Sequence, residues 1–315
     1  MNKKSNRLNK LLVVLFLVFI LTGCTTPLKD SKKKTINNPN TGQTITDNVL
    51  CKPTDEAILK IYEKNKKDIS KLPDCKDFKI AGEYEGLWEN IFVRPLAYAI
   101  IKVGNILNST GWAIIAIAFF IRLALYPVTK KTAMQSENIK KAKPELDKIE
   151  KKYKDKTDEA SMQKKSQEIF ATYKNFGVNP FSSCLFAIIQ MPLLFAFIEA
   201  INRVPAIFEE QFLIFQMGTT PWHGITHGNY QYLILLALVI ITTFLSFKMN
   251  KATANDDMAN QMKMMMPILV VIIGITSFTL PAATGIYWIT SSTFTILQNM
   301  ITDRSDKNGK TNIWR

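Results

Sequence analysis

Long apolar blocks, separated by stretches rich in charge, constrain this sequence more than any other feature. Apolar residues make up 47% of the 315 residues, and most of them lie in blocks that lysines flank. A bilayer core is about 30 Å thick, so a run of about 20 apolar residues is typical of a transmembrane helix. We therefore predict an all-α polytopic membrane protein. Its formal charge of +14 indicates a membrane-facing or ribosome-facing role, because no nucleic-acid motif is evident and no nucleic-acid specificity is expected.

The N-terminus resembles a bacterial lipoprotein signal peptide over residues 1–23. Its first ten residues are basic, and the apolar run that follows is too short to cross a bilayer. The run ends in the motif LTGC, which is similar to a lipobox, so Cys24 is expected to receive palmitate and become the mature N-terminus. An uncleaved anchor with an incidental cysteine is the alternative. Lipidation of Cys24 implies that the mature N-terminus lies outside the cytoplasm.

Residues 24–85 are predicted to form an extracytoplasmic tether and a small segment. Lys, Asn and Thr dominate residues 25–50, which indicates a flexible tether. Cys51 and Cys75 then enclose a short pattern of apolar residues at helical spacing. An extracytoplasmic location permits a disulfide between these two cysteines, and two free thiols are the alternative.

Residues 86–109 mix aromatic and aliphatic residues with charges, and Pro95 interrupts them. Because this stretch is too polar to cross a bilayer comfortably, we predict an amphipathic helix on the outer membrane surface. The core of the protein, residues 110–301, holds five further apolar stretches. The five predicted transmembrane helices cover about residues 111–131, 181–201, 230–247, 264–280 and 281–301.

Lysines outnumber acidic residues between positions 129 and 179, which is typical of a cytoplasmic segment. Two apolar patterns at helical spacing predict a helical hairpin over about residues 132–176. Pro144 suits the first turn of its first helix, and Asp158 suits the N-terminus of its second. An ordinary solvated coiled coil and a docking device fit this pattern equally well. Five spans after an outside start then place the tail, residues 302–315, in the cytoplasm.

Arg122 stands inside the first predicted span. A charged side chain near the centre of a membrane helix costs about 2.5 to 3.5 kcal/mol on insertion scales, so it normally faces water or protein. Glu199, near the outer end of the second span, is the one acid deep in any span. We therefore infer a hydrated cavity lined by Arg122 and polar residues of other spans. Small hydroxyl residues also serve helix packing, which is the alternative for each of them.

The fourth apolar stretch is short. Residues 267–280 would reach about 21 Å as a helix, less than the hydrocarbon core. Thinning of the bilayer is expected around such a helix. A cavity together with a thinned bilayer would lower the cost of moving a polar segment across the membrane.

Enzyme motifs do not emerge from the sequence. HExxH, GxxxxGK[ST] and GxSxG patterns are absent. His223 and His227 are spaced as zinc ligands can be, but neighbouring glycines favour an interfacial loop over a metal site. We predict neither catalysis nor a cofactor nor a metal.

Four stretches resemble the YidC/Oxa/Alb membrane protein insertase family in their order and spacing. They are IRLALYPVTKK, KPELDKIEKKYKDK, YKNFGVNPFSSCLFAIIQMPLLFAF and LPAATGIYWITSSTFTILQ. The resemblance covers about residues 87–301, and it implies five helices around a hydrophilic groove that is closed to the outside. By this resemblance Arg122, Gln190 and Trp288 line the groove. Tyr287 and Ser291, polar residues of the fifth span, are expected beside them.

The resemblance also implies what the protein works on and with. Nascent membrane proteins would be inserted into the bacterial cytoplasmic membrane, with the ribosome, the Sec translocon and the phospholipid bilayer as partners. Two other functions remain compatible with parts of the sequence. A solute transporter or channel also uses polar residues inside the membrane, although no internal repeat is visible. A structural lipoprotein would need only residues 25–85.

Overall fold

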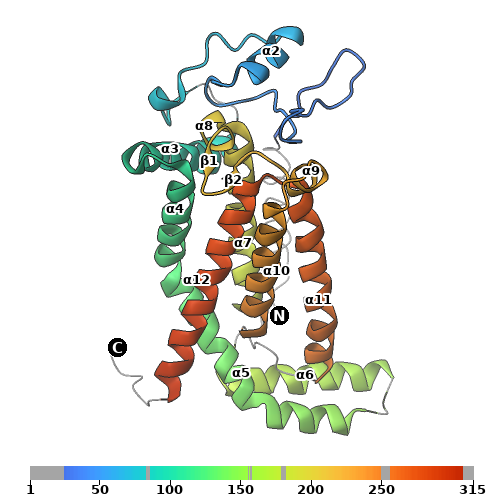
Figure 1. Cartoon of the computed structure of the whole chain (residues 1–315). Helices are drawn as coiled ribbons and strands as arrows, with labels where there is room; N and C mark the ends of the chain where they lie inside the picture. The colour runs from blue at the N-terminus through green and yellow to red at the C-terminus, as the bar shows by residue number, and fades with distance from the viewer. Residues whose placement is uncertain are drawn as a thin grey trace. The chain divides into compact units, whose positions relative to one another are not determined.

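The computed structural model describes residues 25–82, 86–154, 156, 158–178, 182–249 and 256–307. The predicted signal peptide and Cys24 lie outside these residues. The described chain is mostly helical (Figure 1) and divides into two compact units. The first unit comprises Met1–Ala118, Met191–Ala237 and Thr276–Tyr287. The second comprises Phe119–Gln190, Leu238–Ile275 and Trp288–Arg315.

Residues 25–50, in the first unit, fold against helix α2 (Glu56–Lys64) instead of forming a flexible tether. Isolated β-bridges join Pro27 to Thr46 and Asn37 to Thr44. The few apolar residues of this stretch are buried together with apolar residues of α2. The prediction of a tether was wrong because it rested on the polar composition of the stretch. The cluster consists of Leu28, Ile45, Val49, Ile58, Tyr62, Ile69 and Phe208.

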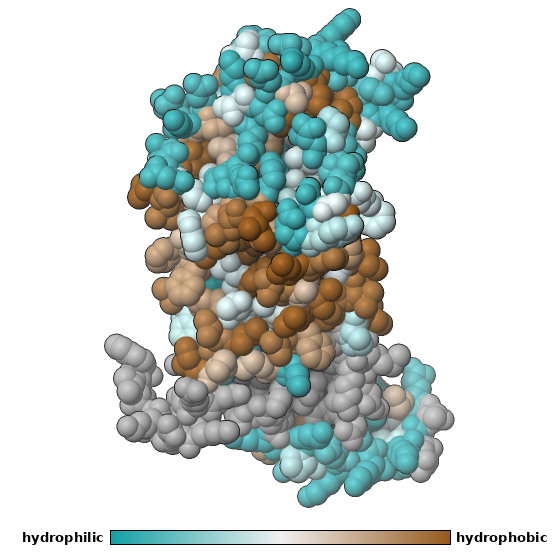
Figure 2. All heavy atoms as spheres, viewed as in Figure 1, coloured by the Kyte–Doolittle hydropathy of each residue, from teal (hydrophilic) through white to brown (hydrophobic). Residues whose placement is uncertain are grey.

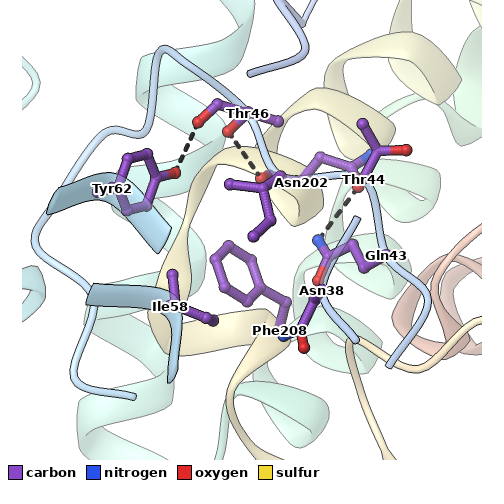
Figure 3. Close-up of a pocket in the computed structure, with 9 residues that line it drawn as sticks. Asn38, Gln43, Thr44, Thr46, Ile58, Tyr62, Asn202 and Phe208 are labelled. Atoms are coloured by element: carbon purple, nitrogen blue, oxygen red, sulfur yellow. Dashed lines mark hydrogen bonds between the residues drawn. The ribbon is translucent and has the colours of Figure 1, made fainter. Parts of the chain in front are cut away.

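A disulfide joins Cys51 to Cys75 and closes the segment that contains α2. Beside α2 lies a cavity of about 10 Å³, which is room for one water molecule (Figure 3). The Tyr62 hydroxyl donates to the Thr46 carbonyl oxygen at 2.6 Å at the edge of this cavity. Burial raises the pKa of Tyr62. The cavity lining comprises Asn38, Gln43, Thr44, Ile45, Thr46, Ile58, Tyr62, Asn202 and Phe208.

The predicted interfacial helix consists of a π-helical turn, Glu89–Val93, followed by α3, Arg94–Leu107. Two of its charged residues, Glu89 and Arg94, are buried rather than solvated, whereas Lys102 is exposed. The Arg203 guanidinium donates to Glu89 at 2.7 Å and lies 3.7 Å from Glu199. Arg94 pairs with the other Glu89 oxygen at 3.4 Å, and Trp88 Nε1 donates to Glu199 at 2.9 Å. These contacts join the start of the interfacial helix to the C-terminal end of α7 (Ser182–Arg203).

Short elements connect α7 to the next long helix of the first unit. They are α8 (Pro205–Phe208), the strands β1 (Gln211–Phe212) and β2 (Phe215–Gln216), and α9 (Pro221–Thr226). The strands pair antiparallel as a small hairpin. Figure 2 shows mostly hydrophilic side chains at the top of the view, where Figure 1 draws residues 25–82, and mostly hydrophobic side chains in the middle of the view.

In the second unit, α4 (Thr110–Ala124) ends before Leu125, and α5 (Tyr126–Lys152) begins directly after it. Pro127 explains the break, because its nitrogen carries no hydrogen to continue the helical ladder and its fixed φ suits a first turn. Pro144 does not begin the hairpin helix, as the sequence suggested, but lies inside α5. Its ring is exposed, so the carbonyl that loses its partner can bond water.

The predicted hairpin forms from α5 and α6 (Glu159–Asn175). The Asp158 side chain caps α6 by accepting from the Ser161 backbone N–H at 2.9 Å, as its position predicted. Hydrogen bonds with the Ser161 side chain and with its backbone N–H lower the pKa of Asp158. Gly177 ends the hairpin with a φ of 64°, a conformation that glycine adopts at little cost. The hairpin core consists of Ala142, Leu146, Tyr173 and Val178, with Ile169 and Phe176 packed against it.

Each of the five predicted spans overlaps a helix, namely α4, α7, α10 (Gln231–Met249), α11 (Asp256–Thr279) and α12 (Ala282–Lys307). The first span was predicted over residues 111–131, and the chain breaks within it at Leu125, between α4 and α5. The fourth span was predicted over residues 264–280; α11 begins earlier, at Asp256, and includes Pro267, but its apolar part is short, at Val270–Thr279.

Among the described residues, two helices are both long and apolar enough to cross a membrane, Glu89–Leu107 and Gln231–Met249. Thr110–Ala124 and Val270–Thr279 are apolar but shorter. The number of spans and the interfacial position of α3 therefore stay predictions.

Candidate functional site

Arg122 is buried near the end of α4, three residues before the break at Leu125, with only 7% of its surface exposed. Its guanidinium donates from Nε to the Ser291 hydroxyl at 2.9 Å, and its Nη2 contacts the same oxygen. Ser291 lies on α12 and is itself 5% exposed. An arginine keeps its proton in proteins, so the contact joins a permanent cation to a neutral acceptor. The hydroxyl orients the guanidinium without cancelling its charge.

Two further polar contacts tie α12 to other helices of the second unit. Trp288 Nε1 donates to the Thr243 hydroxyl of α10 at 2.9 Å. Further along α12, Gln298 Nε2 donates to the Thr129 hydroxyl of α5 at 2.9 Å. Both threonines are buried. With Arg122, α12 therefore makes polar contacts to α4, α5 and α10.

These contacts lie on one face of α12. An α-helix turns about 100° per residue, so Trp288, Ser291 and Gln298 fall within about 80° of arc. Thr295 belongs to the same face, and its hydroxyl donates back to the Ser291 carbonyl oxygen at 3.0 Å. We call Trp288, Ser291, Thr295 and Gln298 the polar row of α12. A row of neutral donors and acceptors beside one fixed cation can hold a polar or acidic chain, but it offers no acid–base pair for catalysis.

Gln190 and Tyr287 were also predicted for the groove, and their place in it stays a prediction. Gln190 is half-buried on α7, in the second unit. Tyr287 is 1% exposed and belongs to the first unit, where its ring stacks on Phe197 with centroids 4.0 Å apart. Tyr287 therefore takes part in aromatic packing, whereas Arg122, Trp288 and Ser291 are each tied into polar contacts of the second unit.

His223 and His227 stack on each other with ring centroids 3.9 Å apart. The ring Nδ1 of His227 lies 2.8 Å from the carbonyl oxygen of His223. Partial burial lowers the pKa of His223, and the neighbouring His227 lowers it further. Within the residues that the structure describes, no group of three or more His, Cys, Asp or Glu side chains is placed to hold a metal ion.

Sequence reasoning expected polar residues of other spans beside Arg122 but did not pair them. Thr243 and Thr129 became specific only through their partners Trp288 and Gln298. The spacing of three, four and three residues along the polar row was a usable signal, because it keeps all four side chains on one helix face. The buried pair of Glu89 and Arg203 had no such signal, since the two residues lie 114 positions apart.

Comparison with known proteins identifies the family of this chain. The model of the 60Kd inner membrane protein family matches residues 102–310. This range includes every residue of the polar row, as well as Arg122 and Gln190. It excludes residues 25–82, which contain the segment closed by the disulfide of Cys51 and Cys75.

Curated relatives cover most of the chain. A protein named membrane protein insertase YidC from Alkalihalophilus pseudofirmus is 37% identical over 227 residues, which is 71% of this chain and 84% of the relative. A protein of the same name from Oceanobacillus iheyensis is 34% identical over 241 residues, covering 74% and 91%. The membrane protein insertase MisCA of Bacillus subtilis is 32% identical over 233 residues, covering 73% and 85%. The chain belongs to the 60Kd inner membrane protein family, the family of these membrane protein insertases.

Proposed function

We propose that this protein is a membrane protein insertase and folding chaperone, which moves hydrophobic segments of nascent membrane proteins into the bacterial cytoplasmic membrane. The contact of buried Arg122 with Ser291 carries the proposal, because it presents a fixed cation through a neutral group. The names of the relatives support the same function. They give no support to the alternative of a solute transporter or channel.

The physical argument starts from the cost of the charge. A guanidinium surrounded by hydrocarbon is unfavourable, so water in a groove would stabilise Arg122. The acidic or polar N-terminal part of a substrate would be attracted to this cation, more strongly than in bulk water because the surroundings have a lower dielectric constant. The apolar segment of the substrate would then leave the groove sideways into lipid.

Other groove residues would assist without chemistry. Ser291 would orient Arg122, and Gln190 and Trp288 would offer further polar contacts to the substrate backbone. Tyr287, stacked on Phe197, would support the groove by packing. No bond is made or broken in this process, so the protein is not proposed to be an enzyme.

The same proposal assigns positions to the segments around the core. Palmitate on Cys24 would anchor the N-terminus at the outer surface, and the lysine-rich hairpin of α5 and α6 would lie in the cytoplasm with the C-terminal tail. In that position the hairpin could meet the ribosome, and the protein would work alone or with the Sec translocon. The interfacial helix would rest on the outer membrane surface.

Complementation of an insertase-depleted bacterial strain tests the proposal. Arg122→Ala and Arg122→Glu are expected to lower membrane insertion roughly tenfold or more, because a hydrogen bond to a charged group contributes about 1.5 to 3 kcal/mol. Arg122→Lys keeps the charge and is expected to restore insertion. Lys102→Ala, which removes an exposed cation over the Tyr98 ring, is the matched control and should have no effect. Full insertion by both Arg122→Ala and Arg122→Glu would refute the charge mechanism.

A further inference from the structure

The turn between β1 and β2 consists of apolar residues that are unusual in a turn exposed to water. Gln211 pairs with Gln216 and Phe212 with Phe215, which leaves Leu213 and Ile214 as a two-residue turn. Such turns need positive φ and normally use Gly, Asn or Asp. Leu213 nevertheless has a φ of 54°, which is unfavourable for a bulky side chain. Leu213 is 68% exposed and Ile214 is 52% exposed, so the protein itself does not bury them.

On the β1 side, the hairpin is held firmly at the start of α4. The Phe212 ring meets the Trp112 ring edge-on, with centroids 5.2 Å apart. Phe212 also lies against Gly111, where even a methyl group would collide with its ring. Glu210, which precedes β1, accepts from the Ser109 hydroxyl at 2.7 Å and from the Thr110 backbone N–H at 2.6 Å. These contacts fix the direction in which the turn points.

On the β2 side, the hairpin is held at the starts of α10 and α12. The Tyr232 hydroxyl lies 3.2 Å from both the backbone N and the backbone O of Gln216. The Ala283 backbone N–H of α12 donates to the Met217 carbonyl oxygen at 3.0 Å. The hairpin is thus fixed to the first turns of three helices, and Figure 1 shows β1 and β2 beside those ends of α4, α10 and α12.

The hairpin itself carries no charge, and the carboxylate of Glu210 before it accepts hydrogen bonds from Ser109 and Thr110. No charged residue occurs from Gln211 to Thr220. Trp112, beside β1, is 51% exposed, and Tyr230, just before α10, is 66% exposed. Exposed Trp and Tyr at the ends of membrane helices are typical of the membrane–water interface. The apolar surface of the turn therefore continues the apolar surface of the helix ends.

We propose that Leu213 and Ile214 insert into the outer leaflet of the membrane, at the boundary between phospholipid headgroups and acyl chains. The partner is phospholipid, because the turn is fixed to the ends of apolar helices and offers no charge for a polar partner. Lipid burial of two aliphatic side chains offsets the unfavourable turn conformation. The usual preference for Gly, Asn or Asp in such turns does not apply here, because the turn lies in lipid rather than in water.

Site-directed spin labelling of the full chain tests this. Ile214→Cys, in a chain whose Cys24 and Cys184 are replaced by serine, is labelled and placed in vesicles of phosphatidylcholine and phosphatidylglycerol. Collisions with oxygen, which concentrates in lipid, and with a water-soluble nickel chelate then report the depth of the label. Two other positions serve as references. Ile234→Cys on α10 is 56% exposed and is the reference for a label in lipid. Ile80→Cys is 45% exposed and is the reference for an exposed apolar residue near the interfacial helix.

The label at position 214 is expected to favour oxygen over the nickel chelate, as the label at position 234 does. A nickel-accessible label would overturn the proposal. A label reached by neither reagent would mean that protein covers the turn, either a second copy or another membrane protein, and would overturn it as well.

A second variant removes the dependence on a label in the turn. Leu213→Gly with Ile214→Asn has residues that suit the turn, so it is expected to fold in detergent with an unchanged melting temperature or a higher one. A spin label at the exposed Gln211 should then become more accessible to the nickel chelate than in the chain with the native turn. Equal accessibility in the two chains would contradict insertion of the turn.

Discussion

At the scale of residues, the contact between Arg122 and Ser291 sets the properties of the candidate site. Five N–H donors of a guanidinium must be satisfied when it is buried, and a donor left without an acceptor costs about 1 to 3 kcal/mol. The Ser291 hydroxyl accepts from the guanidinium of Arg122 and so limits how the side chain can turn. The charge and its orientation thus depend on different residues, and they can be altered separately.

Ser291→Ala is expected to lower insertion several-fold, less than Arg122→Ala, because the cation stays while one acceptor of about 1.5 to 3 kcal/mol is lost. The insertion of a single-spanning substrate in the depleted strain measures this. Thr242→Ala is the control, because the Thr242 hydroxyl donates within its own helix, to the carbonyl oxygens of Leu238 at 2.7 Å and of Val239 at 3.3 Å. An effect of Ser291→Ala no larger than that of Thr242→Ala would show that the contact does not matter.

How far sequence could predict this site depends on the residue. Arg122 was predictable, because a charge within an apolar stretch stands out without any structure. Ser291 was named among many hydroxyl residues on its span, but its contact with Arg122 depends on the rotation of α12 about its axis. Tyr287, on the same span, stacks on Phe197 in the first unit, a contact that no local pattern indicates.

At the scale of elements, buried charges connect the interfacial helix to the end of α7. Arg203 is 2% exposed and bonds Glu89 at 2.7 Å, while its Nε donates to the Asn48 carbonyl oxygen at 2.7 Å. Arg94 donates in the same way to the Ile80 carbonyl oxygen at 3.1 Å. Removal of one partner from such a pair leaves a buried charge and typically costs about 3 to 5 kcal/mol.

Glu89→Gln is therefore expected to destabilise the first unit by about 3 to 5 kcal/mol, seen as a drop of several degrees in melting temperature in detergent. The control is Lys60→Ala, which removes an exposed pair with Glu56 and should change the stability by less than about 1 kcal/mol. Equal melting temperatures for the two variants would mean that the pair does not hold α3 in place.

The hairpin of α5 and α6 depends on its apolar core rather than on its surface charges. Leu146→Ala removes a fully buried side chain and is expected to cost about 2 to 5 kcal/mol. Glu168→Gln removes an exposed pair with Lys152 and is expected to change little. Hydrogen exchange of the hairpin amides measures both. Faster exchange in Glu168→Gln than in Leu146→Ala would assign the stability to the ion pair instead.

Element boundaries were harder to predict than the elements themselves. Each predicted span overlaps a helix, because apolar periodicity is a strong local signal. The first span was predicted as one helix over residues 111–131, whereas the chain breaks at Leu125. Pro144 was expected in the first turn of a helix but lies inside α5, and α11 begins at Asp256, before the predicted start at residue 264. A proline is favoured in a first turn, but a long helix can include one at the cost of a backbone hydrogen bond.

At the scale of the whole molecule, the chain combines a family core with an additional segment. The family match begins at residue 102, whereas residues 25–82 form a small folded body that the disulfide of Cys51 and Cys75 closes. Composition predicted a tether, because the apolar residues of this body are few. Their burial depends on contacts with α2 and with Phe208, far along the chain, which local composition cannot reveal.

Replacement of both cysteines by serine is expected to destabilise this body by about 3 kcal/mol, from the loss of a crosslink between residues 24 positions apart. Trypsin should then cleave within residues 51–75 many times faster than in the native chain. Insertion in the depleted strain is expected to persist, because Arg122 and the polar row belong to the second unit. Loss of insertion comparable to that of Arg122→Ala would give the segment a role in the proposed function.

The polar row of α12 has one further consequence, which concerns motion. Its contacts to α4, α5 and α10 all leave from one face, so turning α12 about its long axis by a single residue would break every one of them together. Displacing one neighbouring helix leaves the polar contacts of α12 to the other two helices in place. We therefore expect α12 to keep its position and its rotation, while the helices around it separate from it one at a time.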